Sequence, residues 1–163
     1  MQKFVTNLWF DKGGEDAAAF YVSLFKNSRI KDTMYYDDAT SEAAGQPKGS
    51  VLTVTFELDG QEYVILNGGP LFPLSEAVSI MVKCEDQAEV DRLWEALTAD
   101  GGQPSQCGWL KDKWGLSWQI VPKRLEELAS DPDKAKVGRA MAAMMKMSKL
   151  DIDKLERAFN GEA

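Results

Sequence analysis

The order of the predicted elements constrains the fold most, because one pattern runs through the chain twice. Its first copy holds a strand, a helix and three further strands, predicted over residues 3–10, 15–25, 29–37, 51–58 and 61–67. Between the last two strands, the Asp59-Gly60 pair is a strong hairpin turn signal. A polar loop is predicted over residues 38–49, and a break in regular structure at Gly68-Gly69-Pro70.

The second copy starts with a predicted strand over residues 78–84 and continues with a helix. Asp86 and Glu89 form a capping-box-like start to that helix, Gly101-Gly102 ends it, and hairpin strands follow to Val121. The apolar faces of the two helices repeat with a constant offset of 73 residues, in the pairs Phe20–Leu93, Tyr21–Trp94 and Leu24–Leu97.

A helical extension is predicted over residues 123–163. Its first helix covers residues 124–129, Asp131-Pro132 opens a second helix that runs to about Met147, and Asp151 caps a third helix through Phe159. Three methionines on neighbouring turns of the second helix are typical of an adaptable packing face, namely Met141, Met144 and Met145.

These elements predict an α+β fold with two β-α-β-β-β modules in a single domain of residues 1–163. The first module covers residues 1–70 and the second covers residues 77–122, before the helical extension. The length of 163 residues is enough for one compact domain or two small halves that share a core.

Composition excludes several classes of partner. A net charge of −7 argues against sequence-independent nucleic-acid binding and against attachment to anionic membranes. No apolar run approaches the roughly 20 residues of a membrane span, and the amino terminus lacks the apolar core of a signal peptide. A cytoplasmic location is therefore expected.

The chain contains no histidine, and this absence excludes several chemistries. Ser-His-Asp and Cys-His catalysis cannot occur, nor can any histidine-based zinc or iron site. Two cysteines are too few for a disulfide scaffold. Cys84 ends an apolar strand and is expected to be a buried, inert thiol, whereas the role of Cys107 is left open.

Three of the five tryptophans lie in the stretch from Cys107 to Pro122. In its second strand, polar Ser117 and Gln119 alternate with apolar Trp118 and Ile120. Uncharged polar side chains would thus project at regular spacing from a strand that is otherwise built for burial. This pattern favours the wall of a small-molecule cavity, but it names no reaction.

Several long motifs together identify a resemblance that covers nearly the whole chain in order. They are Leu66-Asn-Gly-Gly-Pro70, residues 78–91, Cys107-Gly-Trp-Leu-Lys-Asp112, Gly115-Leu-Ser-Trp-Gln-Ile-Val-Pro122 and Lys149-Leu-Asp-Ile-Asp153. The chain resembles the PhnB-like branch of the vicinal oxygen chelate superfamily, which includes glyoxalases, bleomycin-resistance proteins and dioxygenases. Many relatives carry the label demethylubiquinone methyltransferase.

The resemblance implies that the two modules form a curled mixed sheet around an open cavity, commonly in a homodimer. Metal-using members take one ligand from the first and last strand of each module, usually histidine or glutamate. Matching the strands places Ser79 and Gln119 at these positions in the second module and Asn67 in the first. For the first strand Val5, Thr6 and Asn7 all remain candidates, and Asn7 is favoured for its polarity.

The matched residues are neutral amides and a hydroxyl, which leave a divalent cation without compensating charge. We therefore expect no metal site. No glycine-rich loop leads from a strand into a helix as a nucleotide or nucleoside cofactor would need, so no cofactor is expected, and Gly68-Gly69-Pro70 is interpreted as a structural corner.

The first functional hypothesis is metal-independent binding of a small molecule. The predicted ligand-binding residues are Asn7, Trp9, Asn67, Ser79, Trp118 and Gln119, although strand alternation puts Trp118 opposite Gln119 unless a bulge intervenes. The alternative is an enzyme of the superfamily, a metal-assisted lyase, isomerase or dioxygenase, or a methyltransferase as the label suggests. Its acid–base candidates are Glu57, Glu62, Asp112, Tyr35, Tyr36 and Tyr63, and no catalytic residue is assigned. A protein-interaction module is the third hypothesis, which a homodimer satisfies more simply.

Overall fold

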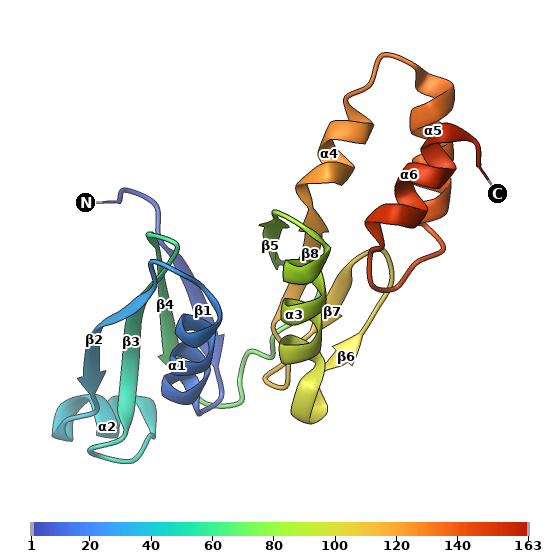
Figure 1. Ribbon diagram of the computed structural model, residues 1–163. Helices are drawn as coiled ribbons and strands as arrows, with labels where there is room; N and C mark the ends of the chain where they lie inside the picture. The colour runs from blue at the N-terminus through green and yellow to red at the C-terminus, as the bar shows by residue number, and fades with distance from the viewer. Residues whose placement is uncertain (1, 163) are drawn as a thin grey trace. The chain divides into compact units, whose positions relative to one another are not determined.

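The computed structural model describes residues 2–162. The chain forms two compact units, Met1–Leu74 and Ser75–Ala163, each with its own four-stranded mixed sheet (Figure 1). Six α-helices accompany the sheets within the described residues. The predicted α+β class is confirmed.

The sheet of the first unit has the strand order β1-β4-β3-β2. Its strands are β1 (Thr6–Phe10), β2 (Arg29–Tyr35), β3 (Val51–Leu58) and β4 (Gln61–Asn67). β1 runs parallel to β4, and the other pairs are antiparallel. Asp59 and Gly60 have φ angles of 46° and 78°, as a two-residue turn of the predicted β3–β4 hairpin requires.

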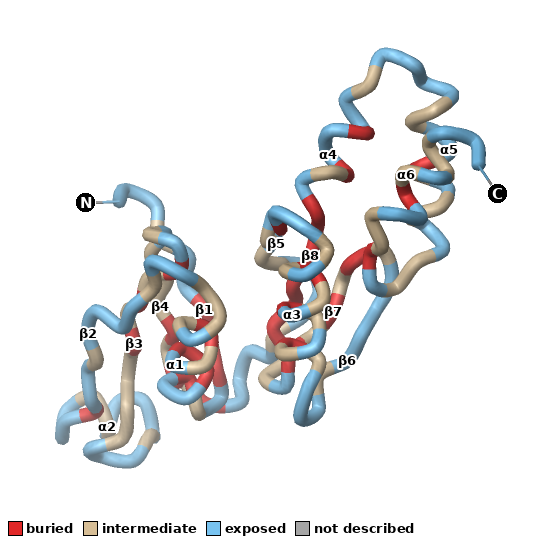
Figure 2. The backbone as a smooth tube through the Cα atoms, in the orientation of Figure 1, coloured by how far each residue is buried: buried red, intermediate tan, exposed pale blue. Residues whose placement is uncertain are grey.

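Helix α1 (Gly14–Leu24) packs on one face of this sheet. Ala17, Ala18 and Tyr21 are fully buried there. The strands supply the other half of the core from alternate positions, namely Leu8, Phe10, Val54, Phe56 and Ile65. Because side chains alternate along a strand, the intervening residues lie on the opposite, open face of the sheet. Figure 2 shows buried stretches on α1 and on strands beside it.

One prediction in this unit was wrong: the segment expected as a polar loop contains helix α2 (Asp38–Ala44). Its start is a capping box, because the Asp37 carboxylate accepts from the Thr40 N–H at 2.8 Å and the Thr40 hydroxyl accepts from the Asp37 N–H at 2.9 Å. Gly45, at φ 66°, ends it. No residue of α2 is buried, so no apolar periodicity marked the helix in the sequence.

The second unit repeats the same topology with the strand order β5-β8-β7-β6. Its strands are β5 (Ser79–Cys84), β6 (Gln103–Pro104), β7 (Trp109–Lys111) and β8 (Ser117–Pro122), and β5 runs parallel to β8. Helix α3 (Gln87–Thr98) buries Val90, Leu93 and Leu97, and a short 3-10 turn, Ala99–Gly101, follows it. The two β-α-β-β-β modules are therefore present as predicted.

The cap of α3 differs from the predicted capping box in one bond. Asp86 accepts from the Glu89 N–H at 2.8 Å, as expected. The Glu89 carboxylate, however, accepts from the N–H of Glu85 at 2.7 Å, one residue before the cap.

Corresponding residues of the two modules are separated by one number of residues in the helices and by another in the first strands. The fully buried pair Ala17 and Val90 extends the 73-residue offset of the helices. In the first strands, the buried ends Phe10 and Cys84 are 74 residues apart, because the connection from strand to helix is one residue shorter in the second unit.

The helical extension comprises α4 (Lys123–Ala129), α5 (Lys134–Met144) and α6 (Ile152–Asn160). The predicted start of the second helix was wrong: Asp133 caps it by accepting from the N–H groups of Ala135 and Lys136, while the Asp131 carboxylate accepts from the Asp133 N–H. The same helix ends at Met144, and Asp151 caps α6 as predicted.

An apolar cluster joins the extension to the end of the second sheet. Its buried members are Val121, Leu125, Leu128, Leu150 and Leu155, with Met141, Met144, Met147 and Phe159 packed against them. Among the described residues, no helix is long and apolar enough to cross a bilayer.

Candidate functional site

The open face of the second sheet carries a row of polar side chains. Cross-strand pairing sets Gln103 beside Lys111, Lys111 beside Ser117, and Ser117 beside Ser79. A second row on the same face contains Trp109, Gln119 and Met81. Four strands therefore contribute an amide, an ammonium and two hydroxyl groups to one surface.

The side chains of Ser79 and Lys111 in this row have polar partners, whereas the buried Ser117 hydroxyl has none among the described residues. The Gln119 amide donates to the Ser79 hydroxyl at 2.9 Å, and the Lys111 ammonium forms an ion pair with Glu76. Ser117 is fully buried, and its hydroxyl has no hydrogen-bond partner among the described residues. A buried polar group without a hydrogen-bond partner costs free energy, so we expect a ligand or a water molecule to bond to the Ser117 hydroxyl.

A groove of about 350 Å³ opens over this row within the second unit. It is lined by Glu76, Gln103, Pro104, Ser105, Trp109, Leu110, Lys111 and Ser117. Its volume falls at the lower end of the range that holds small organic ligands. Ser117 was noted in the sequence only as part of the alternation, and Lys111 and Trp109 were not singled out for binding, because β7 is only three residues long and gives no periodic signal.

Trp118 lies on the other face of β8, against the helix side, and is fully buried. Its indole N–H donates to the Asp112 carboxylate at 2.9 Å. Asp112 also accepts from the N–H groups of Trp114 and Leu116, at 2.9 and 3.1 Å. The pairing of β5 with β8 is regular, so no bulge brings Trp118 beside Gln119. Asp112 thus anchors the turn between β7 and β8.

Asn67 is buried on the helix side of the first sheet, where its amide joins three segments of the unit. The side-chain oxygen accepts from the Gly14 N–H at 2.8 Å, and the amide nitrogen donates to Glu15 and to the Val51 carbonyl at 2.8 and 3.1 Å. Because the N-cap residue of α1, Gly13, offers no side chain, Asn67 supplies the missing cap from a neighbouring strand.

Asn7 and Trp9 lie on the open face of the first sheet. Asn7 is exposed and Trp9 is half-buried, with its indole N–H donating to the Gly69 carbonyl at 2.9 Å. A side-chain carbon on Gly68 would come within 2.3 Å of the Trp9 ring, so the close approach requires glycine. Gly68 and Gly69 therefore form a structural corner beneath Trp9.

The strand pairing also assigns counterparts between the modules. Counted back from the buried pair Phe10 and Cys84, Ser79 corresponds to Val5 and Met81 to Asn7. Gln119 pairs with Met81 as Val64 pairs with Asn7. The first module thus carries valines, Val5 and Val64, where the second carries Ser79 and Gln119.

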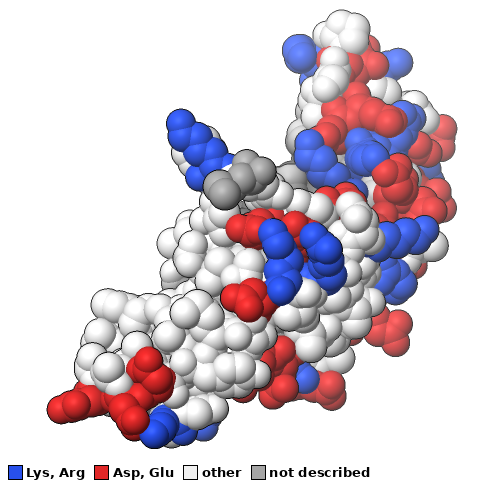
Figure 3. Space-filling model, turned by 90° about the vertical axis from the view of Figure 1, so that its left-hand side faces the viewer, with Lys and Arg blue, Asp and Glu red and all other residues white. Residues whose placement is uncertain are grey.

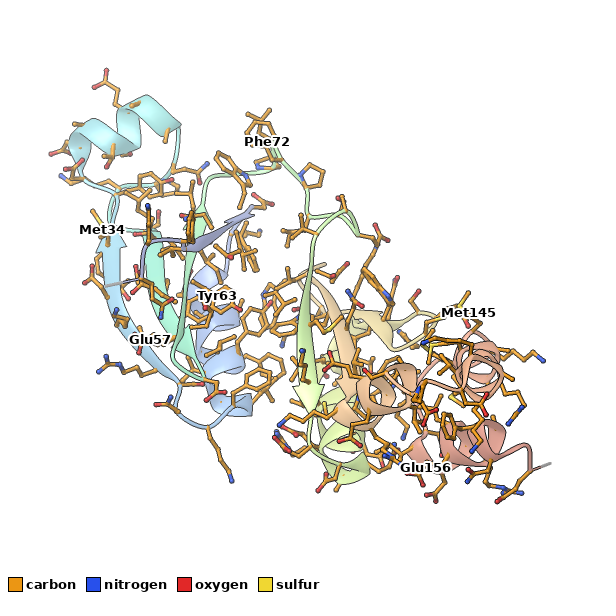
Figure 4. All side chains as sticks on the ribbon, turned by 90° about the horizontal axis from the view of Figure 1, so that it is seen from above. Met34, Glu57, Tyr63, Phe72, Met145 and Glu156 are labelled. Carbon is orange, nitrogen blue, oxygen red and sulfur yellow. The ribbon has the colours of Figure 1, made fainter. Side chains whose placement is uncertain are left out.

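Ionisable groups on the open face of the first sheet are paired with each other. Glu57 contacts Arg29 at 3.0 Å and Lys31 at 3.3 Å, and Lys31 also contacts Glu62. The hydrogen bonds from Arg29 and Lys31 lower the pKa of the Glu57 carboxyl, the opposite of what a general base needs. Figure 3 shows this compact group of both signs, and Figure 4 shows Met34 and Glu57 toward opposite ends of the sheet.

Burial and hydrogen bonding act on several of the other candidate acids and nucleophiles. Burial raises the pKa of the Tyr63 hydroxyl. The Tyr36 hydroxyl donates to the backbone carbonyl of Asn67 at 2.7 Å. Burial raises the pKa of Cys84 to about 12, which agrees with the predicted inert thiol. Cys107 is half-buried, and its sulfur lies 3.8 Å from that of Met145.

Comparisons with known proteins decide the family. A family model described as 3-demethylubiquinone-9 3-methyltransferase matches residues 2–121, which span both modules. The chain belongs to this family. The match ends before α4, so the helical extension lies outside it. A comparison with proteins of curated function found no match.

Solved structures include one relative with the same family label and others that share the fold. A PhnB protein from Bacillus cereus, also titled a 3-demethylubiquinone-9 3-methyltransferase, is 32% identical, with a TM-score of 0.66 over 74% of this chain and 99% of that chain. The fosfomycin resistance protein FosX from Listeria monocytogenes shares the fold at 17% identity and a TM-score of 0.54, over 77% of this chain and 94% of that chain. Protein PA1353 from Pseudomonas aeruginosa is 18% identical, with a TM-score of 0.59 over 75% and 98%.

The residues present here do not fit the metal site that the resemblance to the vicinal oxygen chelate superfamily implies. No group of three histidine, cysteine, aspartate or glutamate side chains gathers within residues 2–162. Ser79 and Gln119 bond to each other, and Asn67 is committed to the cap of α1. Hard divalent cations take carboxylate oxygens, and softer ones take imidazole or thiolate, so neither class finds its donors at these positions.

Proposed function

We propose that the protein binds a small organic molecule on the open face of its second sheet, without a metal ion. The observation that carries the proposal is the Ser117 hydroxyl, which is buried at the groove and has no partner among the described residues. Its neighbours Ser79, Gln119 and Lys111 add directed donors around it. A few oriented polar groups within a mostly apolar lining are typical of small-molecule sites.

Two of the residues predicted from the sequence, Ser79 and Gln119, enter the proposal, because they lie on the open face of the second sheet. Ser79 and Gln119 lie beside Ser117 on that face, next to the residues that line the groove. Asn7 and Trp9 lie on the open face of the first unit, and their role as ligand contacts stays a prediction. Asn67 and Trp118 turn toward the helices, and their polar groups bond within the protein. We propose that these two position the strands and do not contact the ligand.

A fragment screen by NMR tests this function. The protein would be treated with a chelator and titrated with a library of small acids, amides and phenols, while backbone amide shifts are followed. We expect shifts that centre on Ser79, Lys111 and Ser117 and that persist in the chelator. Ser117→Ala should weaken the bound fragments roughly three- to tenfold. Ser130→Ala is the matched control, because its hydroxyl bonds only to the Glu126 carbonyl in the extension.

Two results would contradict the proposal. The first is a library without any fragment that perturbs this face. The second is binding that disappears with the chelator and returns with magnesium or manganese.

We also propose that the chain forms a homodimer in the cytoplasm. Several large apolar side chains of the first unit are exposed, including Met34, Tyr35, Leu71 and Phe72. Exposed apolar side chains of this size are common where a protein contacts a partner. Light scattering across a concentration series would report the dimer, and cell fractionation would report the location.

A further inference from the structure

We propose that the ligand of the groove is a small organic carboxylate, and that the Glu76 side chain occupies the carboxylate position in the free protein. This inference rests on the proposed binding function and names the class of molecule. It follows from the charges that line the groove and from the way they are paired.

The groove has one positive group, the Lys111 ammonium, and its lining contains one carboxylate, Glu76. The two form an ion pair. Glu76 lies in the turn before β5, and 61% of its side chain is exposed, whereas only 35% of the Lys111 side chain is exposed. The more exposed partner is thus held at the positive group by a short segment at the rim.

Displacement of the Glu76 carboxylate from Lys111 by a ligand should cost little free energy. Exposed ion pairs contribute roughly 0–1 kcal/mol, because water and salt screen them. The hydrogen bond from Lys111 lowers the pKa of Glu76, so the Glu76 side chain is a carboxylate at neutral pH. An incoming carboxylate would restore the same pairing with Lys111, so the ammonium would not be left without a counter-charge.

The neighbouring hydroxyl makes the incoming carboxylate the better partner. Ser117 is directly paired with Lys111 across the β7–β8 ladder, and its hydroxyl is free to donate. A carboxylate has two oxygens, so one can accept from Lys111 and the other from Ser117. The ion pair of Glu76 leaves Ser117 without a partner, and a ligand carboxylate that reaches both donors would satisfy it.

The remaining lining suits an apolar body on the carboxylate. Trp109 and Pro104 form walls beside Lys111, on the strands β7 and β6. An aromatic ring would gain contact with the indole, since stacked or edge-on aromatic pairs contribute roughly 0.5–1.5 kcal/mol beyond area burial. The Lys111 ammonium would repel a cationic ligand. A dianion would find only one ammonium for its two negative charges.

The test compares benzoate with benzamide, two probes of nearly equal shape that differ in charge. Amide shifts of the wild-type protein are followed in a titration with each probe. We expect benzoate to bind at Lys111 and Ser117 at least roughly tenfold more tightly than benzamide, because charged hydrogen bonds contribute about 1.5–3 kcal/mol.

Two substitutions at the ion pair sharpen the result. Glu76→Gln removes the competing carboxylate and should tighten benzoate binding roughly two- to fivefold. Lys111→Met should weaken benzoate roughly tenfold and leave benzamide nearly unchanged. Glu76 is on the surface, so its substitution does not endanger the fold, and the amide spectrum of each variant reports that the fold is intact.

The outcomes separate this inference from the binding function. Benzamide and neutral fragments that shift Ser117 as strongly as benzoate would overturn the carboxylate and leave the binding function standing. Inorganic phosphate that binds more tightly than benzoate and depends on Lys111 would also overturn it. Glu76→Gln with unchanged benzoate affinity would refute the role of Glu76. Absence of any fragment from this face would remove both proposals.

Discussion

Removing the side chain of Asn67 should destabilise the first unit rather than weaken a ligand. The Asn67→Ala variant loses the acceptor for the Gly14 N–H and the donor to the Val51 carbonyl. Loss of a helix cap costs about 0.5–2 kcal/mol, and a half-buried carbonyl without its donor costs about 1–3 kcal/mol more. We therefore expect a loss of about 2–4 kcal/mol in the free energy of unfolding.

The assay should follow the first unit alone. Trp9 is the one tryptophan of the sequence within Met1–Leu74, so its resonance in fluorotryptophan-labelled protein reports that unit during urea unfolding. Asn7→Ala is the matched control, since the Asn7 amide is exposed and bonds only to the Val5 carbonyl at 3.3 Å. Its effect should stay within about 0.5 kcal/mol.

A second variant distinguishes the cap from general packing. Asn67→Asp keeps an acceptor for Gly14 but sets a carboxylate beside Glu15, whose oxygen now lies 2.8 Å from the amide nitrogen. This variant should be destabilised at neutral pH and should recover in part in acid, where the carboxyl groups protonate. A stable Asn67→Ala protein that instead lost binding of a fragment would refute the reasoning and restore Asn67 as a ligand contact.

Four further predictions concern close packing, a buried carboxylate, a buried thiol and a surface ion pair. Gly14→Ala should destabilise the first unit by about 1–3 kcal/mol in urea unfolding, because its new carbon would lie 2.2 Å from Ile65 Cγ2, and unchanged stability would contradict this close packing. Asp112→Asn should lower the melting temperature and the free energy of unfolding, the latter by about 2–4 kcal/mol, because the asparagine NH₂ cannot accept from the Trp118 indole. An unchanged melting curve would show that this hydrogen bond is not needed. With a thiol reagent at about pH 8, one cysteine should react in the folded protein and two in urea, because the pKa of Cys84 is about 12, below which it stays a thiol. Rapid reaction of both would contradict that burial. Finally, folding lowers the pKa of the Glu57 carboxyl from 4.5, so its ion pairs stabilise the protein above that pH. This stabilisation is lost as the pH falls through the folded pKa. The difference in unfolding free energy between wild type and Glu57→Gln should therefore close between about pH 6 and about pH 3.

Much of the fold could be predicted because burial imposes strong periodicity. The core of α3 with Val90, Leu93 and Leu97 follows the helical spacing of the sequence, and the Asp59-Gly60 turn is where the hairpin signal placed it. Helix α2 was missed because local hydrogen bonds of Asp37 and Thr40, not an apolar face, hold its start.

The candidate site was harder to predict because the face of a side chain depends on pairing, not on polarity. Asn67 was placed at a ligand position by matching the last strands of the two modules, yet pairing with Phe10 directs it to the helix side. Ser79 was placed by matching the strand before each helix, and Gln119 by the motif around Trp118. The two side chains are hydrogen-bonded to each other on the open face of the sheet. Glu76 and Lys111 are far apart in the sequence, and no local signal links a turn residue to a three-residue strand.

The helical extension is bonded to the same hairpin that carries the groove. The N–H groups of Cys107 and Gly108 donate to the carbonyls of Met147 and Ser148, both at 2.8 Å, directly before Trp109. Gln87 of α3 also bonds to Leu150 and Ile152. A protein cut back to residues 1–122 would therefore lose the brace behind β7 and uncover Val121. The segment that follows the family match thus holds in place the hairpin on which the groove is built.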